Sequence, residues 1–171
     1  GPADLRHHLA HIQVIHPDDL PRFAALNATA NMQPIWACHE PTMDERTIPF
    51  IGQERAGWQY PFASLLSHGA RLAAGSDWPV TSPNPLLEME VATTRVSPSA
   101  RGREPFLPDE RISLDAALAA FTIGSAFVNH LDAETGSIEV GKYADLVLLD
   151  RNLRDAEGGP LGEAEVLATW V

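Results

Sequence analysis

A carboxylate, Asp77, stands directly after a short apolar run that ends at Gly75 and Ser76. Apolar runs of this length between glycine and proline are typical of buried strands in parallel sheets. In barrels of alternating strands and helices, the residues just past the carboxyl ends of the strands line the active site. Asp77 is therefore a candidate metal ligand or general base. The alternative is that it only caps the next turn or helix.

Histidine is the second residue type that could do chemistry, and the chain has seven of them. His11 lies on a stretch that alternates like a strand, where a lone histidine is more often a hydrogen-bonded core residue than a ligand. A histidine nitrogen and a carboxylate oxygen both suit a zinc-like ion, but two ligands do not make a tight site. Spacing alone therefore indicates only an α/β domain.

Composition restricts the kinds of binding partner and the cellular compartment that we expect. The chain has 171 residues, 44% hydrophobic and 20% charged, and a formal net charge of -11. This size suits one domain, or one domain with a small appendage. The acidic balance argues against nucleic acid and anionic membranes as partners. No apolar stretch is long enough to cross a bilayer and no secretory signal is visible, so we expect a cytoplasmic protein.

Cys38 is the single cysteine, so no internal disulfide can form and a reducing compartment is the default. Its neighbour His39 could suggest a Cys–His pair. Such pairs are normally assembled in space rather than in sequence. A partly buried structural thiol is therefore the favoured interpretation.

The apolar periodicity predicts alternating strands and helices in the first part of the chain. Proline and acidic residues at 17–19 indicate a helix start, Gly69 a helix end and Ser113 an N-cap. The chain between 36 and 59 reads as a long loop with one short helix. The predicted strands are 8–15, 28–35 and a run ending at Gly75, and helices are predicted from 17, near 48–55, and over 60–68, 86–95 and 114–121.

The character of the sequence changes at Gly136, where β-prone segments follow one another. Residues 137–140 and 144–150 are predicted as two strands joined by a turn at Gly141 and Lys142, and 166–171 is β-prone as well.

Taken together, these segments resemble the YtcJ-like branch (amidohydrolase family 3) of the amidohydrolase superfamily. The similarity runs in order over nearly the whole chain. The Gly-Ser-Asp-Trp-Pro-Val run at 75–80 and the Gly-Lys-x-Ala-Asp-Leu-Val run at 141–147 are its most specific parts. Further matching segments are 9–23, 32–34, 60–66 and 136–140.

This resemblance implies a fold, a cofactor and site residues. Residues 1–134 would be the C-terminal part of a (β/α)8 TIM-type barrel, about strands 6 to 8 with their helices, and 135–171 part of a small β-sandwich. The enzyme would hydrolyse carbon–nitrogen bonds of small amide-like substrates with water activated by a divalent metal, commonly zinc. By resemblance His11 and Asp77 are metal ligands, and Asp77 is also the catalytic proton acceptor. Trp36, His39 and Trp78 would lie near the mouth as substrate contacts.

Two departures from the family pattern carry expectations of their own. Ala10 stands where the family has a glutamate before the histidine, and the family's first-strand and fifth-strand metal ligands are not in this chain. We therefore expect an incomplete portion of a larger enzyme, with little catalysis by itself, completed by an N-terminal half or a second copy. The alternative is a catalytically inactive module that self-associates through open sheet edges.

Overall fold

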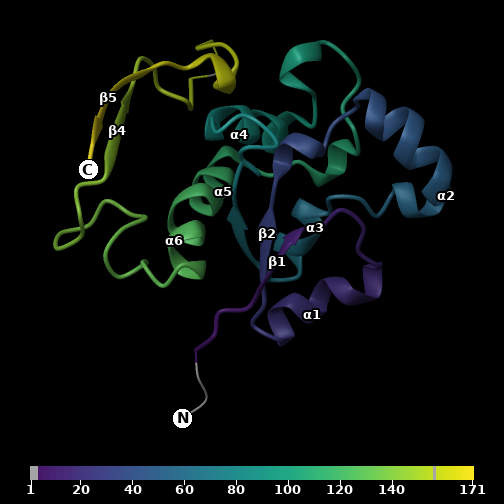
Figure 1. Cartoon of the computed structure of the whole chain (residues 1–171), viewed down its shortest axis with the longest axis horizontal. Helices are drawn as coiled ribbons and strands as arrows, with labels where there is room; N and C mark the ends of the chain where they lie inside the picture. The colour runs from purple at the N-terminus through teal and green to yellow at the C-terminus, as the bar shows by residue number, and fades with distance from the viewer. Residues whose placement is uncertain (1–3, 156) are drawn as a thin grey trace.

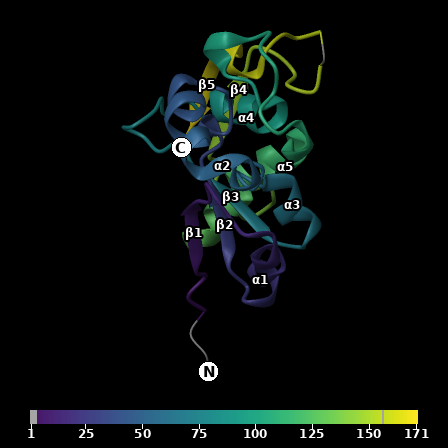
Figure 2. The ribbon, with the colours of Figure 1, turned by 90° about the vertical axis from the view of Figure 1, so that its right-hand side faces the viewer.

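A three-stranded parallel sheet forms the centre of the molecule, and a second, two-stranded antiparallel sheet lies apart from it, at the left of the view in Figure 1. The computed structural model describes residues 4–155 and 157–171. In Figure 2 the three parallel strands lie next to one another, in the order β1, β2, β3. The strands are β1 (His8–His11), β2 (Thr29–Met32), β3 (Arg71–Ala74), β4 (Leu146–Leu149) and β5 (Val166–Trp170).

The parallel strands all end at the same edge of the sheet. The register places His11 opposite Met32, and Met32 opposite Ala74. Ala30 and Met32 of the central strand are fully buried, as expected for a strand covered on its faces. The predicted α/β class with a parallel sheet is confirmed, and the residues that follow the three strands are brought together.

The first strand is shorter than predicted. His11 and Ile12 have φ angles of 66° and 57°, so the backbone leaves the extended conformation there. The prediction of a strand over 8–15 was wrong beyond His11. The second strand is also shorter, because Pro34 begins a helical turn two residues after Met32.

Short helices follow and connect the strands. In Figure 1, α1 and α2 lie to the right of the sheet, and α5 and α6 lie to its left. Within the described part of the chain, every helix is too short or too polar to traverse a lipid bilayer. The helices are α1 (Leu20–Ala25), α2 (Ile48–Ala56), α3 (Phe62–Ser67), α4 (Pro85–Thr94), α5 (Leu114–Ala119) and α6 (Ser125–Val128). Single 3-10 turns lie at Pro17–Asp19, Pro34–Trp36, Pro98–Ala100, Pro108–Glu110 and Leu161–Glu163. Two π-helical segments, Thr42–Thr47 and Ala120–Gly124, lead directly into α2 and α6.

Capping residues explain where several helices begin and end. The Ser113 hydroxyl accepts a hydrogen bond from the backbone N–H of Ala116 at 3.1 Å, as the sequence predicts for an N-cap. Asn84 does the same for α4 by accepting from Leu86 N at 2.9 Å, with Pro85 in the first helical position. Gly69 follows α3 with a φ of 79°, which is the left-handed conformation of a helix end.

The two edges of the parallel sheet differ. At the outer edge of β3, the carbonyl of Ala74 accepts from the Ser125 hydroxyl at 2.7 Å, and Gly124 lies against the carbonyl of Leu72. At the other edge, all four residues of β1 are exposed, and Leu9 is 53% exposed. One edge is therefore covered by the helical segment that leads into α6, while the other is open.

The C-terminal β region differs from its prediction in one respect. Strands β4 and β5 pair antiparallel, but 137–140 forms no strand, so that prediction was wrong. The Lys142 ammonium donates to Asp132 O and to the Ser137 hydroxyl, both at 2.6 Å, and so fixes a loop instead. Ile138 is 88% exposed, which means that no second surface is there for a strand to pack on.

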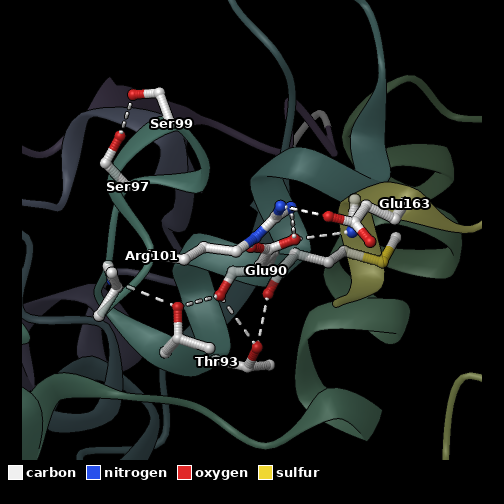
Figure 3. A network of polar contacts seen from close by, with 10 residues as sticks. Glu90, Thr93, Ser97, Ser99, Arg101 and Glu163 are labelled. Carbon is white, nitrogen blue, oxygen red and sulfur yellow. Dashed lines mark hydrogen bonds and ion pairs between the residues drawn. The ribbon is translucent and has the colours of Figure 1, made fainter. Parts of the chain in front are cut away.

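The tail of the chain docks on α4 through a polar network (Figure 3). The Arg101 guanidinium donates to the Glu90 carboxylate at 2.6 and 3.0 Å and also pairs with Glu163. The backbone N–H of Gly162 donates to the same Glu90 carboxylate at 2.8 Å. Residues 160–164 are therefore held against α4. The predicted division of the chain into 1–134 and 135–171 stays a prediction, and residues 1–3 and 156 lie outside the described part.

Candidate active site

His11 and Asp77 face each other across the end of the central strand. The Nε2 atom of His11 lies 3.7 Å from Oδ1 of Asp77. One residue ends β1 and the other follows β3, so their approach depends on the register of the whole sheet. The structure thus brings together the two residues that the sequence singled out for metal binding, although they are 66 positions apart in the chain.

Unusual backbone conformations aim both side chains. Asp77, like His11, has a positive φ, at 64°. Non-glycine residues adopt this conformation at a cost, and such outliers gather at functional sites. Gln33 holds the histidine from behind, because its Oε1 accepts the backbone N–H of His11 at 2.6 Å. Gln33 itself is buried, and its amide donates to Asn31 Oδ1 at 3.0 Å.

The spacing of the two side chains fits a shared metal ion. At 3.7 Å they are too far apart for a direct hydrogen bond. Two ligands at ordinary zinc distances in a tetrahedral site would lie about 3.4 Å from each other. No cluster of three or more histidine, cysteine or acidic side chains suited to a metal occurs within residues 4–155 and 157–171. The described chain therefore offers two candidate ligands and not a full set.

A hollow of about 310 Å³ opens beside this pair. Its walls come from the ends of the strands and from the long segment between β2 and α3. Both aromatic and polar side chains line it, which suits a small polar molecule. The lining residues are His11, Gln13, Trp36, Glu40, Thr42, Met43, Thr47, Tyr60 and Asp77.

The three predicted substrate contacts have different surroundings. Trp36 lines the hollow, and it follows β2 by only a few residues. His39 lies outside the lining set. Its Nδ1 is 2.6 Å from the Asp44 carboxylate, and its ring meets Phe106 edge to face. Trp78 is 67% exposed and also outside the lining set. Substrate contact by each of the three stays a prediction.

A buried carboxyl group lies behind the Asp77 loop. Glu88 on α4 is 1% exposed, and burial, together with the nearby charge of Asp77, raises its pKa to about 8. The backbone N–H of Ile35 opposes this rise by donating to Glu88 Oε2 at 2.7 Å. A carboxyl group with this pKa is mostly neutral at pH 7.

A buried cation supports the opposite wall. Arg95 is fully buried in the left-handed conformation that ends α4, and burial lowers its pKa to about 10. Its guanidinium donates to the carbonyls of Phe106 and Tyr60, at 2.9 and 3.0 Å. Tyr60 lines the hollow, and burial raises the pKa of its hydroxyl. Arg95 therefore fixes the backbone of a wall residue.

Cys38 has the surroundings of a structural thiol. It is 3% exposed, its Sγ donates to Ile35 O at 3.3 Å, and burial raises its pKa to about 11. A reactive cysteine has a lowered pKa instead. The interpretation of Cys38 as structural agrees with this geometry.

Sequence reasoning missed Gln33, Glu88 and Arg95 as supports of the site. Polar residues are rarely fully buried unless they have hydrogen-bond or ionic partners, so their burial in the structure is the signal that identifies them. Pattern alone could not show it, since Glu88 lies in a helix that also carries other charged and apolar residues.

Comparison with known proteins places the chain in a family. The model of the amidohydrolase family matches residues 1–171. The chain belongs to the amidohydrolase family. It is 38% identical over 172 residues to Protein LONG AFTER FAR-RED 3 of Arabidopsis thaliana, covering 100% of this chain and 28% of that protein. It is 38% identical over 112 residues to N-substituted formamide deformylase of Arthrobacter pascens, covering 66% and 20%.

The resemblance to YtcJ-like members is confirmed as well. The chain is 27% identical over 150 residues to YtcJ of Bacillus subtilis, covering 86% of this chain and 28% of that protein. An uncharacterized metal-dependent hydrolase from Pyrococcus horikoshii OT3 superimposes with a TM-score of 0.75 at 26% identity, covering 94% and 31%. The chain thus spans less than a third of the length of each of these four proteins.

Proposed function

We propose that this amidohydrolase-family chain supplies one wall of the active site of a metal-dependent hydrolase that cleaves carbon–nitrogen bonds in small amide-like substrates. His11 and Asp77 are two of the ligands of a divalent metal, with zinc as the favoured ion. Asp77 is also the residue that accepts a proton from the attacking water. The protein acts in the cytoplasm, and neither nucleic acid nor membrane is its partner.

The observation that carries this proposal is the 3.7 Å approach of His11 Nε2 to Asp77 Oδ1. It occurs at the carboxyl ends of parallel strands, beside a hollow large enough for a small molecule. Imidazole nitrogen and carboxylate oxygen are both common zinc ligands. The two side chains are not hydrogen-bonded to each other, so both atoms are free to bind a metal.

The two side chains have separate tasks in such a reaction. A divalent metal held by His11 and Asp77 would make a water molecule more acidic near neutral pH. The Asp77 carboxylate would accept a proton from the attacking water while the water oxygen bonds to the carbonyl carbon of the substrate. When the carbon–nitrogen bond breaks, Asp77 returns the proton to the leaving nitrogen. The backbone hydrogen bond from His11 to Gln33 keeps the imidazole in place.

The names of the relatives support the choice of bond and cofactor. One relative is named as a deformylase of N-substituted formamides, and the superimposed structure is titled a metal-dependent hydrolase. Formamides and other small amides fit a hollow of about 310 Å³. Small amide-like molecules are therefore the proposed substrate class.

The fold proposal follows from the order of the strands. We propose that β1, β2 and β3 are strands 6 to 8 of a (β/α)8 barrel, since each parallel strand follows the last through a helical connection. Strands from an N-terminal half or a second copy complete it. A closed barrel also needs the outer edge of β3, where Gly124 and Ser125 now lie, so this segment must shift on closure. The β4–β5 hairpin is proposed as part of a small β-sandwich.

Zinc titration of the ¹⁵N-labelled chain, followed by NMR, tests the metal site. We expect the signals of His11 and Asp77 to move first, and His11→Ala and Asp77→Asn to remove this response. The matched controls are His68→Ala and Asp109→Asn, at exposed positions away from the hollow. Zinc that leaves the His11 and Asp77 signals unchanged would contradict the proposal. Hydrolysis of N-substituted formamides by the chain together with its completing half tests the reaction.

The open edge of β1 favours a second function, that of a self-associating module without catalysis. Leu9 and Val14 are 53% and 42% exposed near that edge, and exposed strand edges pair readily. Analytical ultracentrifugation combined with the zinc titration distinguishes the two. A stable dimer that binds no zinc supports the module, and a zinc-binding monomer supports the hydrolase wall.

A further inference from the structure

Glu88 reaches two loops of the candidate site although it lies outside the hollow. It sits on α4 and is 1% exposed. Its Oε2 accepts the backbone N–H of Ile35 at 2.7 Å. Its Oε1 lies 3.5 Å from the hydroxyl of Thr81. One side chain therefore contacts the loop that follows β2 and the loop that follows β3.

Each contact is one step from a residue of the site. Ile35 directly precedes Trp36, which lines the hollow. The Thr81 hydroxyl donates to the carbonyl of Ser76, the residue directly before Asp77. Glu88 thus connects the backbone beside Trp36 to the backbone beside Asp77.

The hydrogen atoms in this chain of contacts can be counted. A threonine hydroxyl has one proton, and Thr81 can direct it to Ser76 O or to Glu88 Oε1. A Thr81 proton directed to Glu88 Oε1 favours the ionised carboxylate, whereas with that proton on Ser76 O a neutral Glu88 carboxyl group can donate to the Thr81 oxygen. Burial and the charge of Asp77, the titratable group that acts on Glu88 here, both favour that neutral form. The neutral acid leaves no unpaired charge inside the protein.

We propose that Glu88 is a positioning residue of the candidate site, whose contacts with Ile35 and Thr81 set the Asp77 loop relative to the Trp36 loop. This inference rests on the proposed function, because the loops matter only if Asp77 and Trp36 work there. Glu88 itself touches neither metal nor substrate. Its effect passes through Thr81 and Ile35.

Two substitutions separate positioning from simple packing. In Glu88→Gln the amide oxygen can still accept from Ile35 and the NH₂ group can still donate to Thr81, so it copies the neutral acid. Glu88→Leu keeps an apolar side chain of similar size but loses both contacts. We expect Glu88→Gln to keep the wild-type zinc affinity, and Glu88→Leu to bind zinc about tenfold more weakly or worse. Glu54→Leu, at an exposed position, is the matched control.

The NMR spectrum without metal provides the second readout. In Glu88→Leu the amide signals of Asp77 and Trp36 should both move, and in Glu88→Gln neither should. Thr81→Val removes only the contact on the Asp77 side, so it should move the Asp77 signal and leave the Trp36 signal unchanged. This variant also tests the proposal if Glu88→Leu fails to fold. Unmoved signals in Glu88→Leu and Thr81→Val, or a Glu88→Gln variant that behaves like Glu88→Leu, would overturn the proposal. If wild-type zinc binding fails while these shifts appear, the metal site is wrong and the positioning role stands.

Discussion

Gly124 lies so close to Leu72 that a β-carbon at position 124 would stand 2.2 Å from the Leu72 carbonyl oxygen. The neighbouring contact is to backbone as well, at 3.3 Å from the α-carbon of Ala73. No side-chain rearrangement can relieve this overlap. The helical segment reaches the edge of β3 only because position 124 has no side chain.

Gly124→Ala is therefore expected to lower the stability of the protein. The helical segment must move away from β3, which costs about 1–3 kcal/mol, as overpacking does in other cores. Urea unfolding followed by circular dichroism measures this change. Gly75→Ala is the control, since its added β-carbon would meet nothing nearer than Gln33 Nε2 at 3.8 Å. Equal stability of the two variants would contradict the close contact.

Removal of the Arg101 side chain should release the tail from α4. Arg101→Met leaves the buried Glu90 carboxylate with only the Gly162 N–H, and we expect a loss of about 1–3 kcal/mol. Thermal unfolding measures it, and limited proteolysis should cut near 157–160 sooner. Arg154→Met is the control, because the exposed pair of Arg154 with Asp115 contributes under about 1 kcal/mol. An intact tail in Arg101→Met would show that the network does not hold it.

The raised pKa of Glu88 predicts a particular pH dependence of stability. The folded protein keeps the Glu88 proton up to about pH 8, whereas the unfolded chain releases it near 4.5. Between these values the folded state binds more protons, so the free energy of unfolding falls as the pH rises. Between pH 4.5 and 8 the free energy of unfolding would fall by at most on the order of 5 kcal/mol.

Urea unfolding at pH 4.5, 6 and 8 measures this effect by comparison with Glu88→Gln. The difference between wild type and variant should shrink or reverse toward pH 8, since glutamine does not titrate. A constant difference across the three pH values would mean that folding leaves the pKa of Glu88 unchanged, which contradicts the prediction.

Cys38 should react slowly with thiol reagents in the folded protein. At pH 8 a thiol with a pKa of about 11 is about one part in a thousand thiolate, and the side chain is also buried. We expect labelling at least about a hundredfold slower than in the unfolded chain. His39→Ala should leave the rate unchanged, because His39 pairs with Asp44. Fast labelling in native buffer that His39→Ala abolishes would instead indicate a Cys–His pair.

Local signals in the sequence predicted much of the fold. Ser113 and Gly69 mark helix ends through hydrogen bonds and dihedral angles that act over a few residues, and both are found where expected. The strand predicted at 137–140 failed for a different reason. Its alternating pattern is real, but Ile138 and Val140 have no surface to cover, and Lys142 holds the segment as a loop. Pattern predicts a strand only where a partner exists.

The sequence predicted the main residues of the candidate site, His11 and Asp77, better than the buried residues that hold them in place. Family resemblance pointed to His11 and Asp77, and the structure brings the two together. Spacing could not predict their approach, because it depends on the register of three strands and on left-handed backbone at both residues. Glu88 was missed because a glutamate in a helix is ordinarily a solvated residue, and only packing reveals the exception.

Because the two edges of the parallel sheet differ, a further strand can be added to the sheet more easily at one edge than at the other. An added strand can hydrogen-bond to β1 at once, whereas at β3 it must first displace Gly124 and Ser125. The chain is thus a one-sided acceptor for strand complementation. A synthetic peptide strand that carries a dye would therefore bind at the β1 edge, beside His11, rather than at the β3 edge.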